Sequence, residues 1–266
     1  MNRKSYYIIM AINFCFFAYY LVQVLVGYKT LEENLAFIVL FSVSTSLMIG
    51  KHLFVNYKYK KINNLLTQQC NPDAYIEETQ KLLDKAAKRG QTGNTSVLRI
   101  NLKVGLVAAG RFEEALAVMP YPTLFKNDRI GRIISVTLHH NNFVTLLALG
   151  NMEQAALELA NLHDSLKALT GDKHYKMALH HSQLDDIRFK MINGHFENAE
   201  NAYRNVFDKA KSNIERVSAM LRLGETYQHY GRNEEAREAF EYVVAHGNKL
   251  HAVTSAKERL ASMGNA

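Results

Sequence analysis

The string GRNEEA, at residues 231–236, recurs three more times in the chain, as GRFEEA from Gly110, GNMEQA from Gly150 and GHFENA from Gly194. Each copy has a glycine, a glutamate three residues later and an alanine two residues after that. The glycines are separated by 40, 44 and 37 residues (150 − 110, 194 − 150 and 231 − 194). Self-similarity at such a period predicts a structure built from stacked repeats.

The three residue types of the string have distinct roles at a helix boundary. Glycine readily adopts the left-handed or turn conformation that ends a helix. A glutamate in the first turn of the next helix meets its positive end, and alanine permits close packing between helices. Apolar residues at helical spacing flank the glycines, as in VLRINLKVGLVAA before Gly110 and MEQAALELANL after Gly150. We therefore expect an all-α chain of antiparallel helical pairs, without strands.

The repeat resembles the tetratricopeptide repeat (TPR) family. The likeness is clearest in the last unit, which carries, in the spacing of the family signature, Leu223, Gly224, Tyr227, Gly231, Ala236 and Phe240. The middle units match fewer positions, and in the first unit Pro120 and Pro122 should end the second helix early. The resemblance covers most of residues 94–247, and it implies a TPR-like α-solenoid.

Two further helices should close this array at its ends. The segment AYIEETQKLLDKAAKRG, from Ala74, is expected to pack on the first pair. The segment LHAVTSAKERLASM, from Leu250, is expected to cap the last apolar face with a C-terminal helix. We assign residues 74–266 to the solenoid and residues 58–73 to a juxtamembrane linker, whose polar residues also fit an extension of the preceding helix.

Residues 1–57 are far more apolar than the rest of the chain. The run YYIIMAINFCFFAYYLVQVLVG, residues 6–27, contains no charge and is long enough to cross roughly 30 Å of hydrocarbon. A second run, residues 35–55, is apolar apart from Ser42, Ser44, Thr45 and Ser46 and from Lys51 and His52 near its end. We predict a transmembrane hairpin with helices at about 6–27 and 35–55. A cleaved signal peptide is less favoured, because its apolar region is usually about 7 to 15 residues long.

Basic residues flank the predicted hairpin on one side only. The segment between the two runs, GYKTLEEN, carries Glu32 and Glu33 against a single lysine, whereas the outer ends carry Arg3, Lys4, Lys51, Lys58, Lys60 and Lys61. Lysine and arginine accumulate on the cytoplasmic side of membrane helices. We therefore expect a multi-pass protein of the plasma membrane, with its N-terminus and its solenoid in the cytoplasm.

The formal charge of +7 does not by itself predict a nucleic-acid partner. Lys81, Lys85 and Lys88 form a helical stripe, but acidic residues interrupt it and no aromatic residues that could stack on bases lie between them. We expect a solvated helix face and no nucleic acid. The lipid bilayer is the expected partner of the two transmembrane helices, and a homo-oligomer is left open.

The sequence carries no motif typical of an enzyme. Gly90 and Gly93 lack the spacing of a phosphate-binding loop, and no nucleophile motif is present. Paired histidines occur at 139–140 and 180–181, but no helix carries a His-x-x-x-His pair and no cysteine accompanies them. We predict no catalytic residues, no cofactor and no metal, and keep a metal-dependent enzyme that uses these histidines as a weak alternative.

The resemblance implies that the first helix of each pair lines a concave groove that receives a protein or peptide. The candidate groove residues are Asn101, His140, Asn141, His181, Asp185, Arg188, Arg222, Glu225 and His229. Some members of the family bind the C-terminal carboxylate of chaperones through lysines, asparagines and an arginine on these helices. Only Asn141 matches that pattern here, which disfavours a chaperone tail as the ligand.

The resulting functional hypothesis is a membrane-tethered scaffold or adaptor that binds a protein or peptide partner through the concave face of a cytoplasmic solenoid. A tether of this kind raises the effective concentration of the binding domain at the bilayer. The alternative is a peptide-sensing regulatory protein whose solenoid changes shape when its ligand binds.

Overall fold

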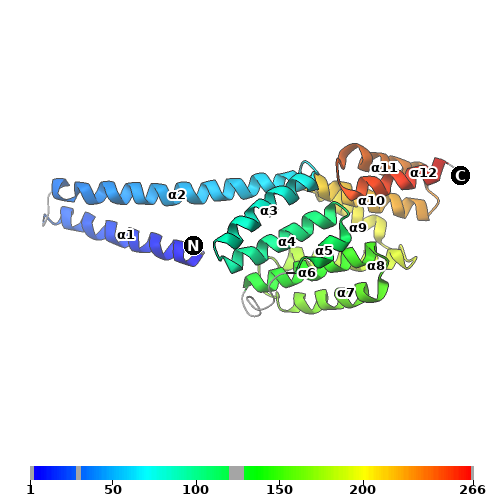
Figure 1. The fold of residues 1–266 in the computed structure, drawn as a ribbon, viewed down its shortest axis with the longest axis horizontal. Helices are drawn as coiled ribbons and strands as arrows, with labels where there is room; N and C mark the ends of the chain where they lie inside the picture. The colour runs from blue at the N-terminus through cyan, green and yellow to red at the C-terminus, as the bar shows by residue number, and fades with distance from the viewer. Residues whose placement is uncertain (1–2, 28–30, 120–128, 265–266) are drawn as a thin grey trace. The chain divides into compact units, whose positions relative to one another are not determined.

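The computed structural model describes residues 3–27, 31–119 and 129–264, and these residues form helices and short turns, with no strand among them. Pro120, Pro122 and the predicted loop through Asp128 lie outside the described residues. The helices, drawn in Figure 1, are α1 (Arg3–Leu25), α2 (Leu31–Thr67), α3 (Pro72–Lys88), α4 (Thr92–Ala108), α5 (Phe112–Ala117), α6 (Arg129–Ala148), α7 (Met152–Lys167), α8 (Tyr175–Ile192), α9 (Ala199–Lys209), α10 (Asn213–His229), α11 (Asn233–His246) and α12 (His251–Gly264). The all-α prediction is confirmed.

The chain divides into two compact units, residues 1–61 and residues 62–266. In the second unit each helix packs mainly on helices that are near it in sequence. The pairs α4 with α5, α6 with α7, α8 with α9 and α10 with α11 follow one another in that order, and α3 packs on α4. Figure 1 shows α6 and α7 lying alongside each other and α10 beside α11.

The glycine of each repeated string ends a helix in the left-handed conformation, as its residue type predicts. The φ angles are 77° at Gly110, 76° at Gly150, 86° at Gly194 and 70° at Gly231. In each case the N–H of the next residue donates to the carbonyl five residues earlier, for example from Arg232 to a carbonyl 2.9 Å away. This six-to-one bond satisfies a carbonyl that the end of the helix leaves open.

The alanine of each repeated string is completely buried. Ala115, Ala155, Ala199 and Ala236 all have an exposed fraction of 0%. Each lies near the start of the second helix of its pair, where a larger side chain would push the two helices apart. The string therefore encodes both the turn and the close approach that follows it.

Two glycines inside helices allow equally close packing. A Cβ atom at Gly224 on α10 would lie 2.5 Å from the ring of Phe240 on α11, which is completely buried. A Cβ atom at Gly105 on α4 would lie 2.8 Å from the ring of Tyr75 on α3. At both positions the glycine makes room for an aromatic ring from the adjacent helix.

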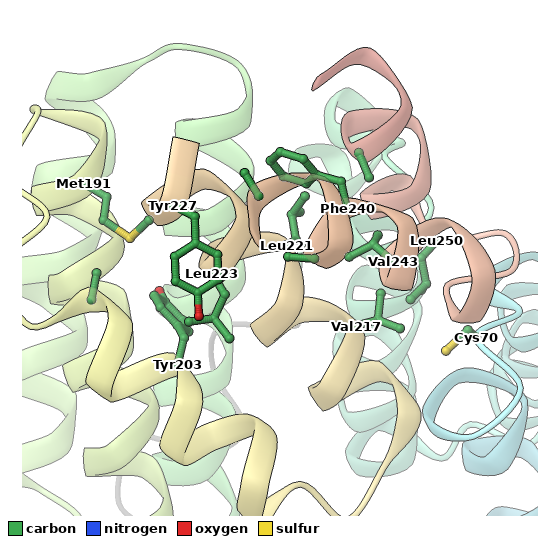
Figure 2. Packing of buried hydrophobic residues seen from close by; sticks show 14 of the residues in the cluster. Cys70, Met191, Tyr203, Val217, Leu221, Leu223, Tyr227, Phe240, Val243 and Leu250 are labelled. Carbon is green, nitrogen blue, oxygen red and sulfur yellow. The ribbon is translucent and has the colours of Figure 1, made fainter. Parts of the chain in front are cut away.

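The largest apolar core joins residues that are far apart in sequence. It contains Ile62 and Leu66 at the end of α2, Cys70, and buried side chains of α8 to α12. Figure 2 shows Cys70 near Leu250, in the same core as Val217 and Val243. A second core lies between α6, α7 and α8 around Phe143, and a third lies around Leu106 on α4.

Residues 58–73 do not form a separate linker. The helix α2 continues to Thr67, and Ile62 and Leu66 are buried because they have an apolar core to pack against. The polar residues of this segment occupy its other positions. The segment is therefore better described as an extension of the preceding helix than as a linker.

The segment after α2 is bonded to the C-terminal part of the chain. The Nδ2 atom of Asn213 donates to the carbonyl of Gln68 at 2.7 Å, and the Nδ2 atom of Asn248 donates to the carbonyl of Gln69 at 2.8 Å. The backbone N–H of Lys249 donates to the carbonyl of Cys70 at 3.1 Å. These bonds hold the beginning and the end of the second unit together.

The C-terminal helix predicted from Leu250 is present as α12. It packs on α11, and Val253 and Ala256 are buried. Its first residue, His251, also meets the ring of Phe112 edge-on at a centroid distance of 5.0 Å. The last helix therefore covers α11 and touches the first repeated string.

The first unit contains α1 and the greater part of α2. The rings of Phe17 and Phe41 stack at a centroid distance of 5.1 Å, so the two helices are in contact. Many apolar side chains of this unit are exposed, among them Phe14, Phe16, Leu21, Val22, Leu25, Val39, Val43, Leu47, Leu53 and Phe54. Within the described part of the chain, no helix combines the length and the apolar character that a bilayer span requires. The predicted spans 6–27 and 35–55 fall on α1 with the turn after it and on α2, and this finding does not support them as membrane spans.

We expect Gly224→Ala to lower the free energy of unfolding by about 1 to 2 kcal/mol, because the added methyl group overlaps the buried ring of Phe240. The higher helix propensity of alanine offsets only about 1 kcal/mol of that strain. Urea unfolding measures the change. The matched control is Gly264→Ala on α12, where no atom lies near the added carbon. A loss of stability as large in the control would contradict the packing argument.

Candidate functional site

A half-open cavity of about 290 Å³ lies between α4, α6, α7 and α8. One part of its wall is apolar and is formed by Val104, Ile133, Val136, Leu162, Leu169 and Met177. The other part is polar and includes His140, Asn141, His181, Ser182 and Asp185. An apolar body with a few convergent polar groups is the usual construction of a binding pocket in a protein.

A short hydrogen bond links two helical pairs at the polar wall. The Nδ1 atom of His140 on α6 lies 2.6 Å from Oδ2 of Asp185 on α8. The side chain of Asp185 is only 6% exposed, whereas that of His140 is 36% exposed. The carboxylate is thus held in the floor of the cavity by a histidine that itself remains open to water.

His181 lies beside this bond and also faces the cavity. Its ring centroid is 6.2 Å from that of His140. Water reaches the imidazole, but protein surrounds it on most sides, as expected for a residue inside a hollow. This burial, together with the nearby His140, lowers the pKa of His181. The neutral imidazole is therefore favoured, and it can both donate and accept a hydrogen bond.

A cluster of charged side chains follows the cavity along α8 and α10. Arg222 forms an ion pair with Glu225 at 2.7 Å, and both side chains are about one-fifth exposed. Arg188 interacts electrostatically with Arg222 and Glu225. Tyr203 lies in the same group, and burial raises its pKa to about 12.

Seven of the nine predicted groove residues lie at the cavity or in the charged cluster beside it. His140, Asn141, His181 and Asp185 line the cavity, and Arg188, Arg222 and Glu225 form the charged cluster next to Asp185. The Nδ2 atom of Asn141 donates to a carbonyl of its own helix at 2.7 Å, so that part of its amide is already engaged.

Asn101 and His229 are not brought into the cavity. Asn101 lies on α4, but it is not part of the lining. His229 stacks on Phe196 with ring centroids 3.9 Å apart. Both residues occupy first helices of their pairs, as predicted, but Asn101 lies one turn of α4 before the lining residue Val104, and α10, which carries His229, contributes no residue to the lining. Helix assignment alone could not show which residues reach the cavity.

Sequence reasoning did not identify a second polar cluster between α4, α6 and α7. Glu158 lies 2.6 Å from Nδ1 of His139 and accepts a bond from Asn142 at 3.0 Å. Lys103 is completely buried, and its Nζ donates to the carbonyl of Val118 at 3.4 Å. Burial lowers the pKa of Lys103 to about 8, although Glu158 acts in the opposite direction. The available signal was a single lysine inside the apolar run INLKVGLVAA.

The paired histidines do not assemble a metal centre with neighbouring acidic residues. Within the described ranges, no three side chains of histidine, cysteine, aspartate or glutamate lie close enough to share an ion. His140 and His181 are near each other, but Asp185 is engaged with His140. The arrangement can bind through hydrogen bonds and charge.

Comparisons with protein-family models, curated proteins and solved structures give no match to this chain. The likeness to the tetratricopeptide repeat therefore rests on the repeated string and on the geometry that it produces.

We expect Lys103→Met to raise the free energy of unfolding at pH 7 by about 1 to 3 kcal/mol, because it removes a buried charge and keeps most of the volume. The unfolded chain binds the extra proton up to a pH of about 10.4. Wild-type stability should therefore gain a contribution as the pH rises above about 8, and the variant should lack it. Urea unfolding at several pH values measures both effects. Lys257→Met, at an exposed position of α12, is the control.

The imidazole of His181 should make the fold sensitive to acid. Because its folded pKa lies below the ordinary value of about 6.5, the unfolded state binds more protons as the pH falls below 6.5, and stability falls with it. We expect His181→Gln to lessen this loss and to match the wild type near pH 7.5. His251, whose pKa burial also lowers, retains its own share. Equal acid sensitivity in the variant and the wild type would contradict this assignment.

Proposed function

We propose that this chain is a membrane-tethered scaffold or adaptor, and that its second unit is a TPR-like solenoid that binds a protein or peptide partner. The observation that carries the proposal is the cavity, which takes most of its polar wall from α6 and α8. Both are first helices of their pairs, the position that a groove-binding function requires. The wall offers hydrogen-bond donors and acceptors beside an apolar hollow.

The size of the cavity favours a side chain of a polypeptide over a whole metabolite. At about 290 Å³, it lies at the lower limit of typical small-molecule sites, which is roughly 300 Å³. It is also half-open, so a chain can pass across it while one apolar side chain enters. An extended segment or one face of an amphipathic helix can present such a side chain.

The proposed tether is the first unit, as a multi-pass anchor in the plasma membrane with the N-terminus and the solenoid in the cytoplasm. It is supported by the charge-free run 6–27 and by the lysines that flank the second run. The exposed apolar side chains on α1 and α2 support it as well, because an apolar solvent is the environment that such surfaces favour.

The hydrogen bond between His140 and Asp185 favours the peptide-sensing regulator as a second candidate. This bond joins two pairs at the wall of the cavity. A ligand that competes for Asp185 would break the bond and change how the pairs are held together. A regulator would then report its ligand through the shape of the array.

Photo-crosslinking in intact cells tests the adaptor proposal. A photoreactive benzoylphenylalanine at Met177, which lines the cavity and is 58% exposed, should form a discrete adduct with one protein. The same group at Leu157, which is 62% exposed on α7 and outside the cavity lining, should not. The adduct should remain with membranes washed in alkaline carbonate, because the first unit is the proposed anchor.

The outcomes separate the two parts of the proposal. Similar adducts from both positions, or none from Met177, would contradict binding through the cavity. An adduct that carbonate removes from the membranes together with the chain would contradict the transmembrane anchor and leave the groove intact.

A further inference from the structure

One cation beside the cavity has no partner of its own. The Nε atom of Arg188 is buried and makes no hydrogen bond. Over the ranges that the structure describes, the guanidinium also forms no ion pair, in contrast to the neighbouring Arg222. A buried polar group without a partner is costly, and a buried charge more so.

The carboxylates near Arg188 are engaged elsewhere. Asp185 lies 2.6 Å from His140, and Glu225 forms its ion pair with Arg222. Tyr203 also interacts electrostatically with Arg188, but its hydroxyl donates a hydrogen bond to the carbonyl of Leu184 at 3.4 Å. The floor of the groove therefore contains one guanidinium whose direct hydrogen-bonding capacity is unused.

The electrostatic surroundings agree with this geometry. Burial, followed by repulsion from Arg222, lowers the pKa of Arg188 to about 10. The guanidinium remains charged at neutral pH, but in a place where its charge is disfavoured. The charge of an anion that paired with Arg188 would offset both effects, and the planar fork of arginine suits a carboxylate in two-point contact.

The position of Arg188 on α8 places it next to a residue that lines the cavity. It lies three residues after Asp185 on α8, and residues with this spacing are neighbours on a helix surface, roughly 5 to 6 Å apart. Alternate side chains of an extended peptide lie on one face at about 6.6 Å. An extended peptide that crosses this surface can therefore place one side chain in the cavity. The side chain two residues further along the peptide then lies at Arg188.

We propose that Arg188 binds a carboxylate of an acidic peptide segment, and that an apolar side chain of the same segment, two residues away, occupies the adjacent cavity. This assignment rests on the proposed peptide-binding function and specifies its ligand. A carboxylate is favoured over a phosphate group, because Asp185 and Glu225 lie close enough to repel a second negative charge.

Selection from a phage-displayed library of random nine-residue peptides tests the assignment on the full chain in dodecyl maltoside micelles. The wild type should enrich peptides with aspartate or glutamate two residues from a leucine, methionine or phenylalanine. The acidic residue of the best synthetic peptide is then changed to its amide, and fluorescence anisotropy compares the two. The amide should bind the wild type more weakly by about tenfold or more.

The variant Arg188→Met should bind the acidic peptide and its amide equally, and Arg188→Lys should recover part of the preference. Arg237→Met makes the same chemical change at an exposed position of α11 and should retain the full preference. Thermal unfolding of each variant establishes that the array is folded.

Three results would overturn the assignment in distinguishable ways. If no peptide is enriched on the folded wild type, the peptide-binding function itself fails. If peptides are enriched without acidic residues, or if Arg188→Met keeps the acidic preference, peptide binding stands and the role of Arg188 falls. A phosphopeptide preferred to the carboxylate peptide would replace the proposed ligand with a phosphate.

Discussion

The fold depends on how closely two helices can approach at each turn. At the four repeated strings the glycine takes a left-handed conformation, and the alanine five residues later has no exposed surface. The glycine sets the direction in which the second helix leaves, and the alanine sets its distance from the first. Because protein interiors are close-packed, a larger side chain at either residue would displace the second helix and shift the neighbouring pairs as well. The cavity between α4, α6, α7 and α8 depends on this repeated contact for its shape.

The candidate site shows what such an array can build and a single pair cannot. His140 lies on α6, Asp185 and Arg188 lie on α8, and Arg222 lies on α10, which are the first helices of three consecutive pairs. None of these side chains has its partner within its own helix except Arg222, which is paired with Glu225. The arrangement of polar groups at the cavity therefore depends on how consecutive pairs are aligned with one another. When the pairs stack, side chains from separate helices form one surface, which contains the apolar cavity and the charged cluster beside it.

The sequence predicted the elements better than it predicted their contacts. The turns at Gly110, Gly150, Gly194 and Gly231 follow from residue type, because few residues tolerate a positive φ. The burial of Ile62 on α2 and of Lys103 on α4 could not be predicted in the same way, because each depends on packing against segments distant in sequence. The same reason separates His140, which reaches the cavity, from His229, which stacks on Phe196. Periodicity specifies which residues share a helix face, but not which neighbouring helices that face meets.

The bonds between the segment after α2 and the C-terminal helices have a consequence for synthesis. Stacked repeats ordinarily fold from neighbour to neighbour, because each unit contacts only the next. Here Ile62, Leu66 and Cys70 belong to one apolar core with residues as late in the chain as Leu250 and Ala256. While the polypeptide emerges from the ribosome, these early apolar side chains must wait for nearly all of the remaining chain. A nascent chain that stalls before α12 would leave this core incomplete, and its exposed apolar side chains are a surface that a chaperone or a protease would recognise.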